Sequence, residues 1–384
     1  MNKIKLMQNE CNDMKLIFKF FFLLGVPYPE RNISLLVKVF EKILSGFYSI
    51  TSIYILIVIT YHLVGHSFER QTFTSSLHTA FAVILRLHFV VKGKLIFTEI
   101  SSIQKIFSKY GAYPQKSLKL RIILGCILSN ITAVIGVCCF FWATPQSINE
   151  IYKYFIIDMG IPETYEDYFY IFSGFIIVVN NILLFTGQDL AVVLVCFAYY
   201  KLGSFISDTK RDLTSSYSAE ILTPKITHNF TTKVNVLSTS IIKVDSAISP
   251  LAFYLLSLFL FQIMELTAIF LTANGILWHI IFGIHLVVTL MLKLILLVIL
   301  GSRIHERFAE IKELVLTAPV LNERILYEMP SGINHIALCH IVESLSDKAF
   351  MTAMGVIKIE KNVILSILCA FLSYSVLITQ VFNK

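Results

Sequence analysis

Four ionisable side chains lie inside long apolar stretches of this sequence, where a charge is costly. They are Arg86, Lys293, Asp189 and Glu265. An unpaired charge in hydrocarbon costs several kcal/mol, so such side chains pair with one another, reach the polar interface, or line a ligand or ion path. For Arg86 and Lys293 we expect packing or extension toward the interface, with a charge relay as the alternative. We expect Asp189 to lie at the interface or to pair with Lys293.

Glu265 is harder to explain by packing alone, because it lies well inside its apolar run. Its nearest partner along the sequence is His279, across a tight turn. Two interpretations stay open: a hydrogen bond that joins two helices, or a contact with a bound ligand. Aromatic residues such as Trp142 and Tyr170 gather at the same ends of the runs, where either an interfacial belt or a ligand entrance explains them. These four residues are the candidate pocket residues.

Small and polar side chains form one stripe of the last apolar run, residues 362–382. At helical spacing this stripe contains Asn362, Ser366, Cys369, Ala370, Ser373, Leu377 and Gln380. The opposite side of the same helix is apolar. A Gln side chain without a partner is costly in hydrocarbon, so the stripe faces protein or water rather than lipid. The pattern predicts a helix that can line a pore.

The amino-acid composition indicates an integral membrane protein. Hydrophobic residues make up 56% of the 384 residues, charged residues only 15%, and the mean hydropathy is +0.74. A soluble domain of this length is less apolar. Runs long enough to cross about 30 Å of hydrocarbon as helix predict an all-α polytopic protein with seven transmembrane helices, at residues 46–66, 74–91, 122–143, 168–200, 249–272, 276–300 and 362–382.

The distribution of basic residues predicts the orientation. Of the 32 Lys and Arg residues, 27 fall in four alternate segments, 1–45, 92–121, 201–248 and 301–361. Cytoplasmic segments near the spans retain positive charge during insertion. The N-terminus is therefore predicted to be cytoplasmic and the C-terminus extracellular, which is the reverse of a seven-helix G-protein-coupled receptor. The net charge of +7 is a signal of topology and not of nucleic-acid binding.

The predicted spans divide the chain into four parts. Residues 1–45 form a cytoplasmic N-terminal segment, in which 14–26 is interpreted as an amphipathic helix at the membrane surface and not as a signal peptide. Residues 46–300 form a six-helix membrane domain with the ligand pocket on its outer side. Residues 301–361 form a cytoplasmic helical segment, and 362–384 the pore-lining helix with a short outer tail.

The cytoplasmic segment 301–361 has a helical apolar stripe of its own, formed by Ile304, Phe308, Ile311, Leu314 and Val315. This stripe must be buried against other helices, so a cytoplasmic helical bundle is expected, which can also hold subunits together. On the outer side, the acidic loop 144–167 is either a vestibule that concentrates cations or an ordinary solvated loop.

The sequence contains no enzyme signature. The patterns GxSxG, HExxH, Walker A and GxGxxG are absent, as are the DRY and NPxxY patterns of G-protein-coupled receptors. The seven cysteines show neither CxxC pairs nor Cys/His spacing for a metal, so they are interpreted as small buried apolar residues. No catalysis, cofactor or metal is expected.

The end of the chain resembles the C-terminal signature of insect gustatory receptors, in which Thr-Tyr is followed five residues later by Gln-Phe in the last helix. Here Ser373 and Tyr374 stand for Thr-Tyr and Gln380 for the Gln, whereas Val381 replaces the Phe. Upstream residues also look like the family pattern, namely Ala353, Gly355, Ile357 and Ile359. The length, seven spans, inverted topology and long inner connections extend the resemblance over the whole chain.

The resemblance implies a gustatory chemoreceptor that acts as a ligand-gated cation channel. Its partners are then a small-molecule tastant, permeating cations and the lipid bilayer, and it forms a homo- or heterotetramer with other gustatory receptors in the plasma membrane of a sensory neuron, on its dendrite or cell body. Pore-lining positions are Ser366, Ser373, Leu377, Gln380 and Val381, the last at the gate, and Tyr374 packs against neighbouring helices. Alternatives are an insect odorant receptor of the same superfamily, a metabotropic receptor and a secondary transporter.

Overall fold

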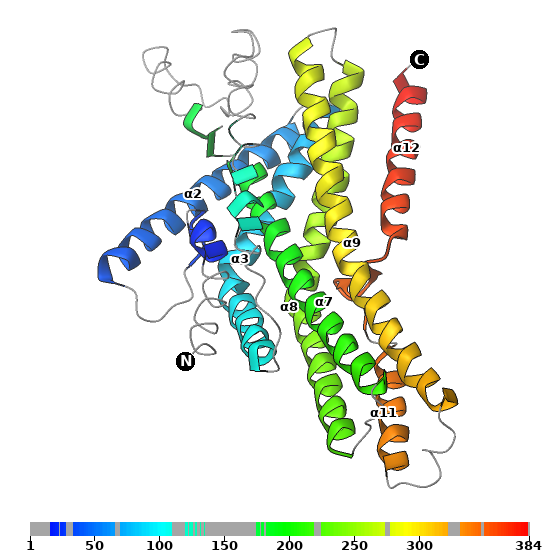
Figure 1. The fold of residues 1–384 in the computed structure, drawn as a ribbon. Helices are drawn as coiled ribbons and strands as arrows, with labels where there is room; N and C mark the ends of the chain where they lie inside the picture. Colours follow the sequence, from blue (N-terminus) through cyan, green and yellow to red (C-terminus); the bar gives the residue numbers. More distant parts are fainter. Residues whose placement is uncertain are drawn as a thin grey trace, which may run out of the picture.

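The protein is a bundle of long helices (Figure 1). The computed structural model describes residues 16–22, 24–27, 34–65, 70–109, parts of 120–134 and 174–179, 182–218, 224–272, 277–321, 331–346 and 349–382. The labelled helices are α2 (Leu35–Gly65), α3 (Arg70–Lys109), α7 (Gln188–Ser218), α8 (Pro224–Thr272), α9 (Leu277–Leu321), α11 (Ser331–Ser346) and α12 (Asn362–Phe382), with a π-helix, η2 (Ile182–Gly187), directly before α7.

Local sequence signals explain where some of these helices begin. The Ser34 hydroxyl accepts a hydrogen bond from the Val37 backbone N–H at 3.4 Å, so Ser34 is the N-cap of α2. Pro224 occupies the first position of α8, where its missing N–H removes no helical hydrogen bond and its fixed φ suits a helix. These signals set the helix starts, whereas the apolar composition sets where the helices are buried.

The described helices overlap six of the seven predicted membrane spans. Four of them are long and apolar enough to cross a membrane, over Leu35–Tyr61, Phe185–Ser216, His228–Thr267 and Gly283–Thr317, and each overlaps one predicted span. The predicted span 74–91 lies within α3 and the last one coincides with α12. The predicted span 122–143 lies mostly outside the described residues. The chain is an all-α polytopic membrane protein.

The lower ends of α7, α8 and α9 form a bundle with α11 (Figure 1). The 49 residues of α8 are about 70 Å long at 1.5 Å per residue, more than twice the thickness of the hydrocarbon core. The predicted apolar stripe of α9 is buried here, since Ile304, Phe308, Ile311 and Val315 are all 0% exposed. The prediction of a buried stripe is confirmed.

The N-terminal segment 16–22 is helical and packs on α3. Its side chains Ile17, Phe18 and Phe21 are almost fully buried, and the rings of Phe18 and Phe21 lie 4.6 Å and 4.4 Å from those of Phe97 and Phe89 on α3. The segment therefore packs one face against α3, and its predicted place at the membrane surface stays a prediction. Protein packing buries more of its aromatic surface than an interface would.

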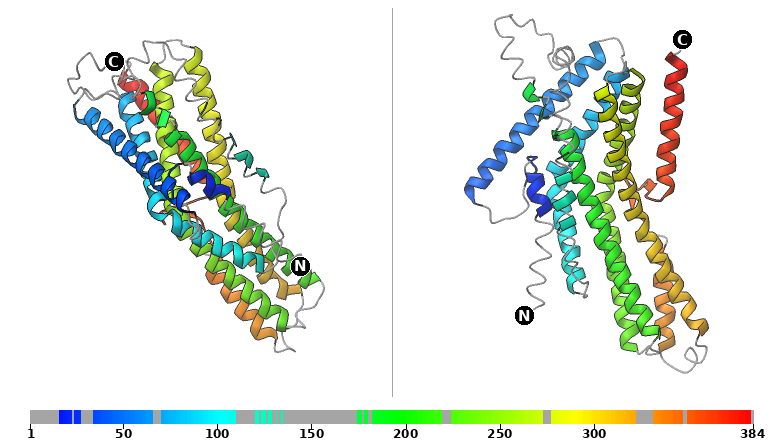
Figure 2. Two further views of the ribbon diagram at one scale, coloured as in Figure 1. Left: turned by 90° about the vertical axis from the view of Figure 1, so that its left-hand side faces the viewer. Right: turned by 45° about the horizontal axis from the view of Figure 1, so that its top comes forward.

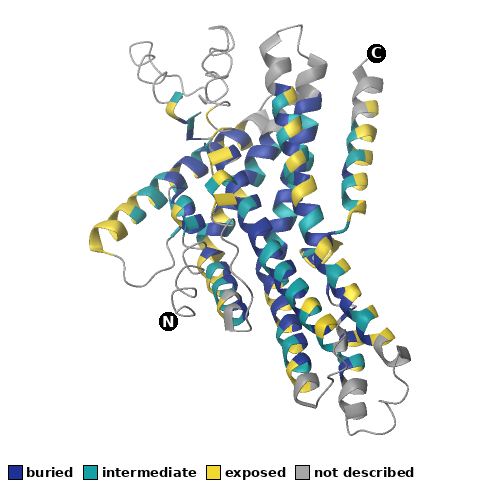
Figure 3. Ribbon diagram, viewed as in Figure 1, coloured by how far each residue is buried: buried dark blue, intermediate teal, exposed yellow. Residues whose placement is uncertain are grey.

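The terminal helix α12 stands at the edge of the bundle, beside α9, in Figure 1 and in the right-hand view of Figure 2. It contacts α8 and α9. Figure 3 shows the contrast in burial: α7 and α8 are largely buried, whereas α12 carries many exposed positions. The arrangement leaves one side of α12 without a covering helix among the described residues.

Candidate functional site

The packing face of α12 is narrow. Ile367 is its one buried side chain among those that the structure describes, and Val363, Ile364 and Phe371 are partly buried against the main core. Tyr374, seven residues and about two helical turns after Ile367, is half-buried on the same side. These positions hold α12 to α8 and α9 through apolar contacts.

The predicted polar stripe lies on an exposed side of α12, about a third of a turn around the helix from the packing face. Asn362, Ser366, Cys369 and Ser373 are all exposed. The Ser366 hydroxyl donates to the Asn362 carbonyl at 3.1 Å, which satisfies its donor inside the helix and leaves oxygen lone pairs toward the exposed side. A polar face that points away from its own bundle needs water or another chain beside it.

The later stripe positions follow from the helix itself. The backbone is helical from Asn362 to Phe382, so Leu377 and Gln380, four and seven residues after Ser373, continue the same stripe. Val381 is one residue further and lies about 100° around the helix from Gln380. The side chains of these three residues are outside the described part, so their predicted roles stay predictions.

Large apolar side chains flank the polar stripe. Leu365, Leu372 and Val376 are 63%, 60% and 54% exposed. They follow one another at helical spacing along a single line of α12. The helix thus has three faces, one packed on its own bundle, one polar and one apolar and uncovered.

Of the predicted pocket residues, the structure describes only the surroundings of Glu265. Trp142 and Tyr170 lie outside the described residues, and for His279, near the start of α9, only the backbone is described. The carboxylate of Glu265 lies 2.7 Å from Nδ1 of His78 on α3. The predicted contact with His279 stays untested, and His78 is a partner that the sequence did not indicate.

The His78–Glu265 contact crosses from α3 to α8 in a buried setting. His78 is 3% exposed, and the side chain of Glu265 is 21% exposed. Beside an ionised carboxylate Nδ1 carries a proton, and Nε2 then accepts in the neutral imidazole and donates in the imidazolium. Nε2 is buried and has no hydrogen-bond partner among the described residues. This pair is a polar point in an apolar region, as small-molecule sites require.

A second polar layer lies where η2 gives way to α7. Gln188 donates to Gln262 of α8 at 3.3 Å, and Asp189 forms an ion pair with Lys293 of α9. The prediction that Asp189 pairs with Lys293 is confirmed. The π-helix directly before Gln188 changes the helical register at this point, and such segments occur often at functional sites.

Arg86 is packed and does not extend to the interface. It is 5% exposed, and it donates to the carbonyls of Leu24 and Ser45 at 3.4 Å and 3.3 Å. Its Nη1 also donates to the Ser52 hydroxyl at 3.3 Å, and its guanidinium lies 5.4 Å from the ring centre of Tyr48. Packing, which the sequence favoured over a charge relay, thus explains Arg86, because carbonyls and hydroxyls replace water around the charge.

The described residues contain no group of three or more His, Cys, Asp or Glu side chains that could hold a metal ion. The site is therefore built from hydrogen bonds, two buried charge pairs and the exposed face of α12. This arrangement can bind a polar ligand and allow helices to shift. Helix α8 connects the polar contacts with α12, because it contacts α3, α7, α9 and α12.

Comparison with known proteins supplies the fold. No protein-family model matches the chain, and no curated protein matches it in sequence. Among solved structures, the insect olfactory receptor OR5 from Machilis hrabei in complex with eugenol matches with a TM-score of 0.68 at 13% identity, over 99% of this chain and 100% of that one. A second structure of the same receptor matches with a TM-score of 0.66 at 12% identity, also over 99% of this chain and 100% of that one. The chain therefore has the fold of an insect olfactory receptor over its whole length.

Proposed function

We propose that this chain is the subunit of a ligand-gated cation channel that detects small molecules, of the gustatory type. The observation that carries the proposal is the polar stripe of α12, which is exposed and lies away from its packing face. In a lone subunit such a face is costly in a membrane. Around a central axis, the same face from several copies lines a path for hydrated ions.

Four copies, identical or mixed with related chains, are the assembly that the gustatory-receptor resemblance implies. The lower bundle of α7, α8, α9 and α11 offers a surface that can hold copies together outside the membrane. The apolar flank Leu365, Leu372 and Val376 then meets the neighbouring α12. The distribution of basic residues supports a cytoplasmic position for this bundle and an outer C-terminus. The gustatory-receptor resemblance implies the plasma membrane of a sensory neuron.

Ligand recognition is assigned to the outer half of the membrane domain. Glu265 and His78 are the described polar contact there, and Trp142, Tyr170 and His279 complete the candidate pocket. A ligand with a polar group that hydrogen-bonds to Nε2 of His78 suits this position. Channel opening in response to a ligand then depends on a movement of α8 and α9 that is passed on to α12.

An odorant receptor of the same channel type is the second candidate, and a specific observation favours it: the similar structure is an olfactory receptor that binds eugenol. The Ser373-Tyr374 and Gln380 spacing favours the gustatory type. A screen by calcium imaging separates the two, with sugars, bitter compounds and volatile odorants, eugenol among them, applied to cells that express the chain alone or with co-receptors. Responses confined to volatile compounds would favour the odorant type.

Permeation tests the channel itself. We expect Gln380→Ala and Val381→Ala to change ion selectivity or the open fraction in whole-cell recordings, because both positions lie at the outer end of the ion path. Leu292→Ala, on an exposed position of α9, is the matched control and should leave permeation unchanged. Unaltered currents in both α12 variants at equal surface expression would contradict the pore assignment.

A further inference from the structure

The segment between α11 and α12 folds as a small hairpin with a demanding turn. Strands β1 (Thr352–Ala353) and β2 (Ile357–Lys358) are antiparallel, with Thr352 opposite Lys358. The two turn residues, Met354 and Gly355, have φ of 54° and 71°, as a type I′ turn requires. Methionine rarely adopts a positive φ, so contacts outside the hairpin must hold this turn.

One turn of α8 supplies those contacts. The carboxylate of Asp245 accepts from the backbone N–H of Thr352 at 2.6 Å and from its hydroxyl at 2.7 Å. Four residues later, the Ser249 hydroxyl accepts from the Gly355 N–H at 3.1 Å, and the Ser249 carbonyl accepts from the Met354 N–H at 3.1 Å. Hydrogen bonds to a carboxylate are short and strong. Asp245 therefore makes the principal bond between hairpin and α8.

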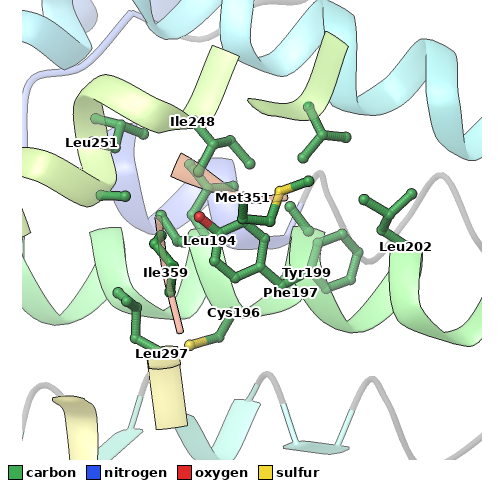
Figure 4. Close-up of a cluster of buried hydrophobic side chains, with 14 of the residues drawn as sticks. Leu194, Cys196, Phe197, Tyr199, Leu202, Ile248, Leu251, Leu297, Met351 and Ile359 are labelled. Atoms are coloured by element: carbon green, nitrogen blue, oxygen red, sulfur yellow. The ribbon is translucent and has the colours of Figure 1, made fainter. Parts of the chain in front are cut away.

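The other side of the hairpin is wedged against α7 and α9. Met351 and Ile359 are almost fully buried, and Figure 4 shows them in one cluster with Tyr199, Ile248 and Leu297. A Cβ placed on Gly301 of α9 would lie only 2.7 Å from Ile359. The hairpin is thus fixed closely among three helices.

The hairpin leads directly into α12. Lys361 forms a 2.7 Å ion pair with Glu306 of α9, and α12 begins at the next residue, Asn362. The backbone N–H of Val363 also donates to the Glu360 carbonyl at 2.9 Å. A shift of the hairpin must therefore shift the first turn of α12.

We propose that Asp245 is a positioning residue for α12, which couples the position of α8 to the base of the terminal helix through Thr352. The same α8 carries Glu265, twenty residues further along, about 30 Å away at 1.5 Å per residue. Pro250 directly follows Ser249 inside α8 and removes one helical N–H there, so α8 is weakened beside the hairpin contact. That this coupling acts on a gate rests on the proposed function; the mechanical coupling itself does not.

Hydrogen–deuterium exchange of the purified full-length protein tests the coupling without any ligand. Asp245→Ala removes both acceptor oxygens and Thr352→Val removes only the hydroxyl, whereas Thr352→Ser keeps it. Lys243→Ala, at an exposed neighbouring position of α8, is the matched control. We expect exchange about tenfold faster in Asp245→Ala and Thr352→Val, both in the hairpin and in the first two turns of α12, with parental rates in the other two variants.

The outcomes separate coupling from local support. Faster exchange in the hairpin with unchanged exchange in α12 overturns the proposal, as does equal exchange in Thr352→Val and Thr352→Ser. If Asp245→Ala does not fold, Thr352→Val with its serine rescue still decides. The Thr352 hydroxyl also lies 3.1 Å from the Ser249 hydroxyl and accepts from the Gly355 N–H at 3.2 Å. The double variant Asp245→Ala/Thr352→Val should therefore exchange faster than Asp245→Ala alone, and slower exchange in the double variant would contradict the coupling.

Unliganded and ligand-evoked currents of the same variants then address gating. A changed open fraction in Thr352→Val, restored in Thr352→Ser, extends the coupling to the gate. If α12 exchange responds as expected but the parent chain carries no current, the proposed function fails and the coupling stands. If the parent conducts and α12 exchange does not respond, the coupling fails and the proposed function stands.

Discussion

The lower bundle and the terminal helix differ in how they are held. In the bundle, α9 buries a complete stripe, with Ile304, Phe308 and Ile311 inaccessible to solvent. On the described part of α12, Ile367 alone is buried, and much of the remaining restraint comes from the hairpin at its base. A densely packed scaffold resists change, whereas an element with few buried contacts can move at small cost in free energy. The difference indicates where the molecule is rigid and where it can move.

The largest effect is expected from a cavity in the scaffold. Phe308→Ala removes a fully buried ring and should lower the free energy of unfolding by about 3–5 kcal/mol. Leu372→Ala on α12, where the side chain is exposed, is the matched variant and should change stability by less than about 0.5 kcal/mol. Thermal unfolding in detergent with a fluorescent thiol-independent probe measures both. Equal losses would remove the distinction between the two regions.

The buried ion pair should respond nearly as strongly. Lys293→Met leaves the Asp189 carboxylate, which is 3% exposed, without its ammonium partner and should cost about 3 kcal/mol. The double variant Lys293→Met/Asp189→Leu should recover most of this loss, since no charge stays buried. The same unfolding assay measures both proteins. A double variant less stable than the single one would show that the pair itself, and not its desolvated remnant, stabilises the bundle.

A smaller effect is expected at the boundary between the two regions. Gly301→Ala places a methyl group against Ile359, whereas nothing lies within 4 Å of a Cβ on Gly46. Overpacking of this kind costs about 1–3 kcal/mol, while Gly46→Ala in the middle of α2 should gain about 0.5–1 kcal/mol from helix propensity. Opposite signs in the unfolding assay would support the close fit of the hairpin. A stable Gly301→Ala protein would show that the hairpin yields easily.

Periodic features of this molecule could be predicted from the sequence, because they are local. Hydropathy located the spans, and helical spacing located both the stripe of α9 and the exposed stripe of α12. The Asp189–Lys293 pair was predictable because few charges lie in the spans. The Asp245–Thr352 and His78–Glu265 contacts join residues 107 and 187 positions apart, and no local pattern encodes such pairings. Arg86 is surrounded in part by backbone carbonyls, and a backbone carbonyl leaves no signal in a sequence.

The central claim is that the exposed polar face of α12 borders the ion path, and the native Cys369 on that face allows a direct test. Cys369 is exposed, whereas Cys196 in the core is buried. We predict that a positively charged, membrane-impermeant methanethiosulfonate reagent reduces the cation current of the parent channel by more than about half, because charge added in a pore repels cations. The current of Cys369→Ser should be unaffected. Full labelling of Cys369, confirmed by mass spectrometry, with an unchanged current would contradict the account.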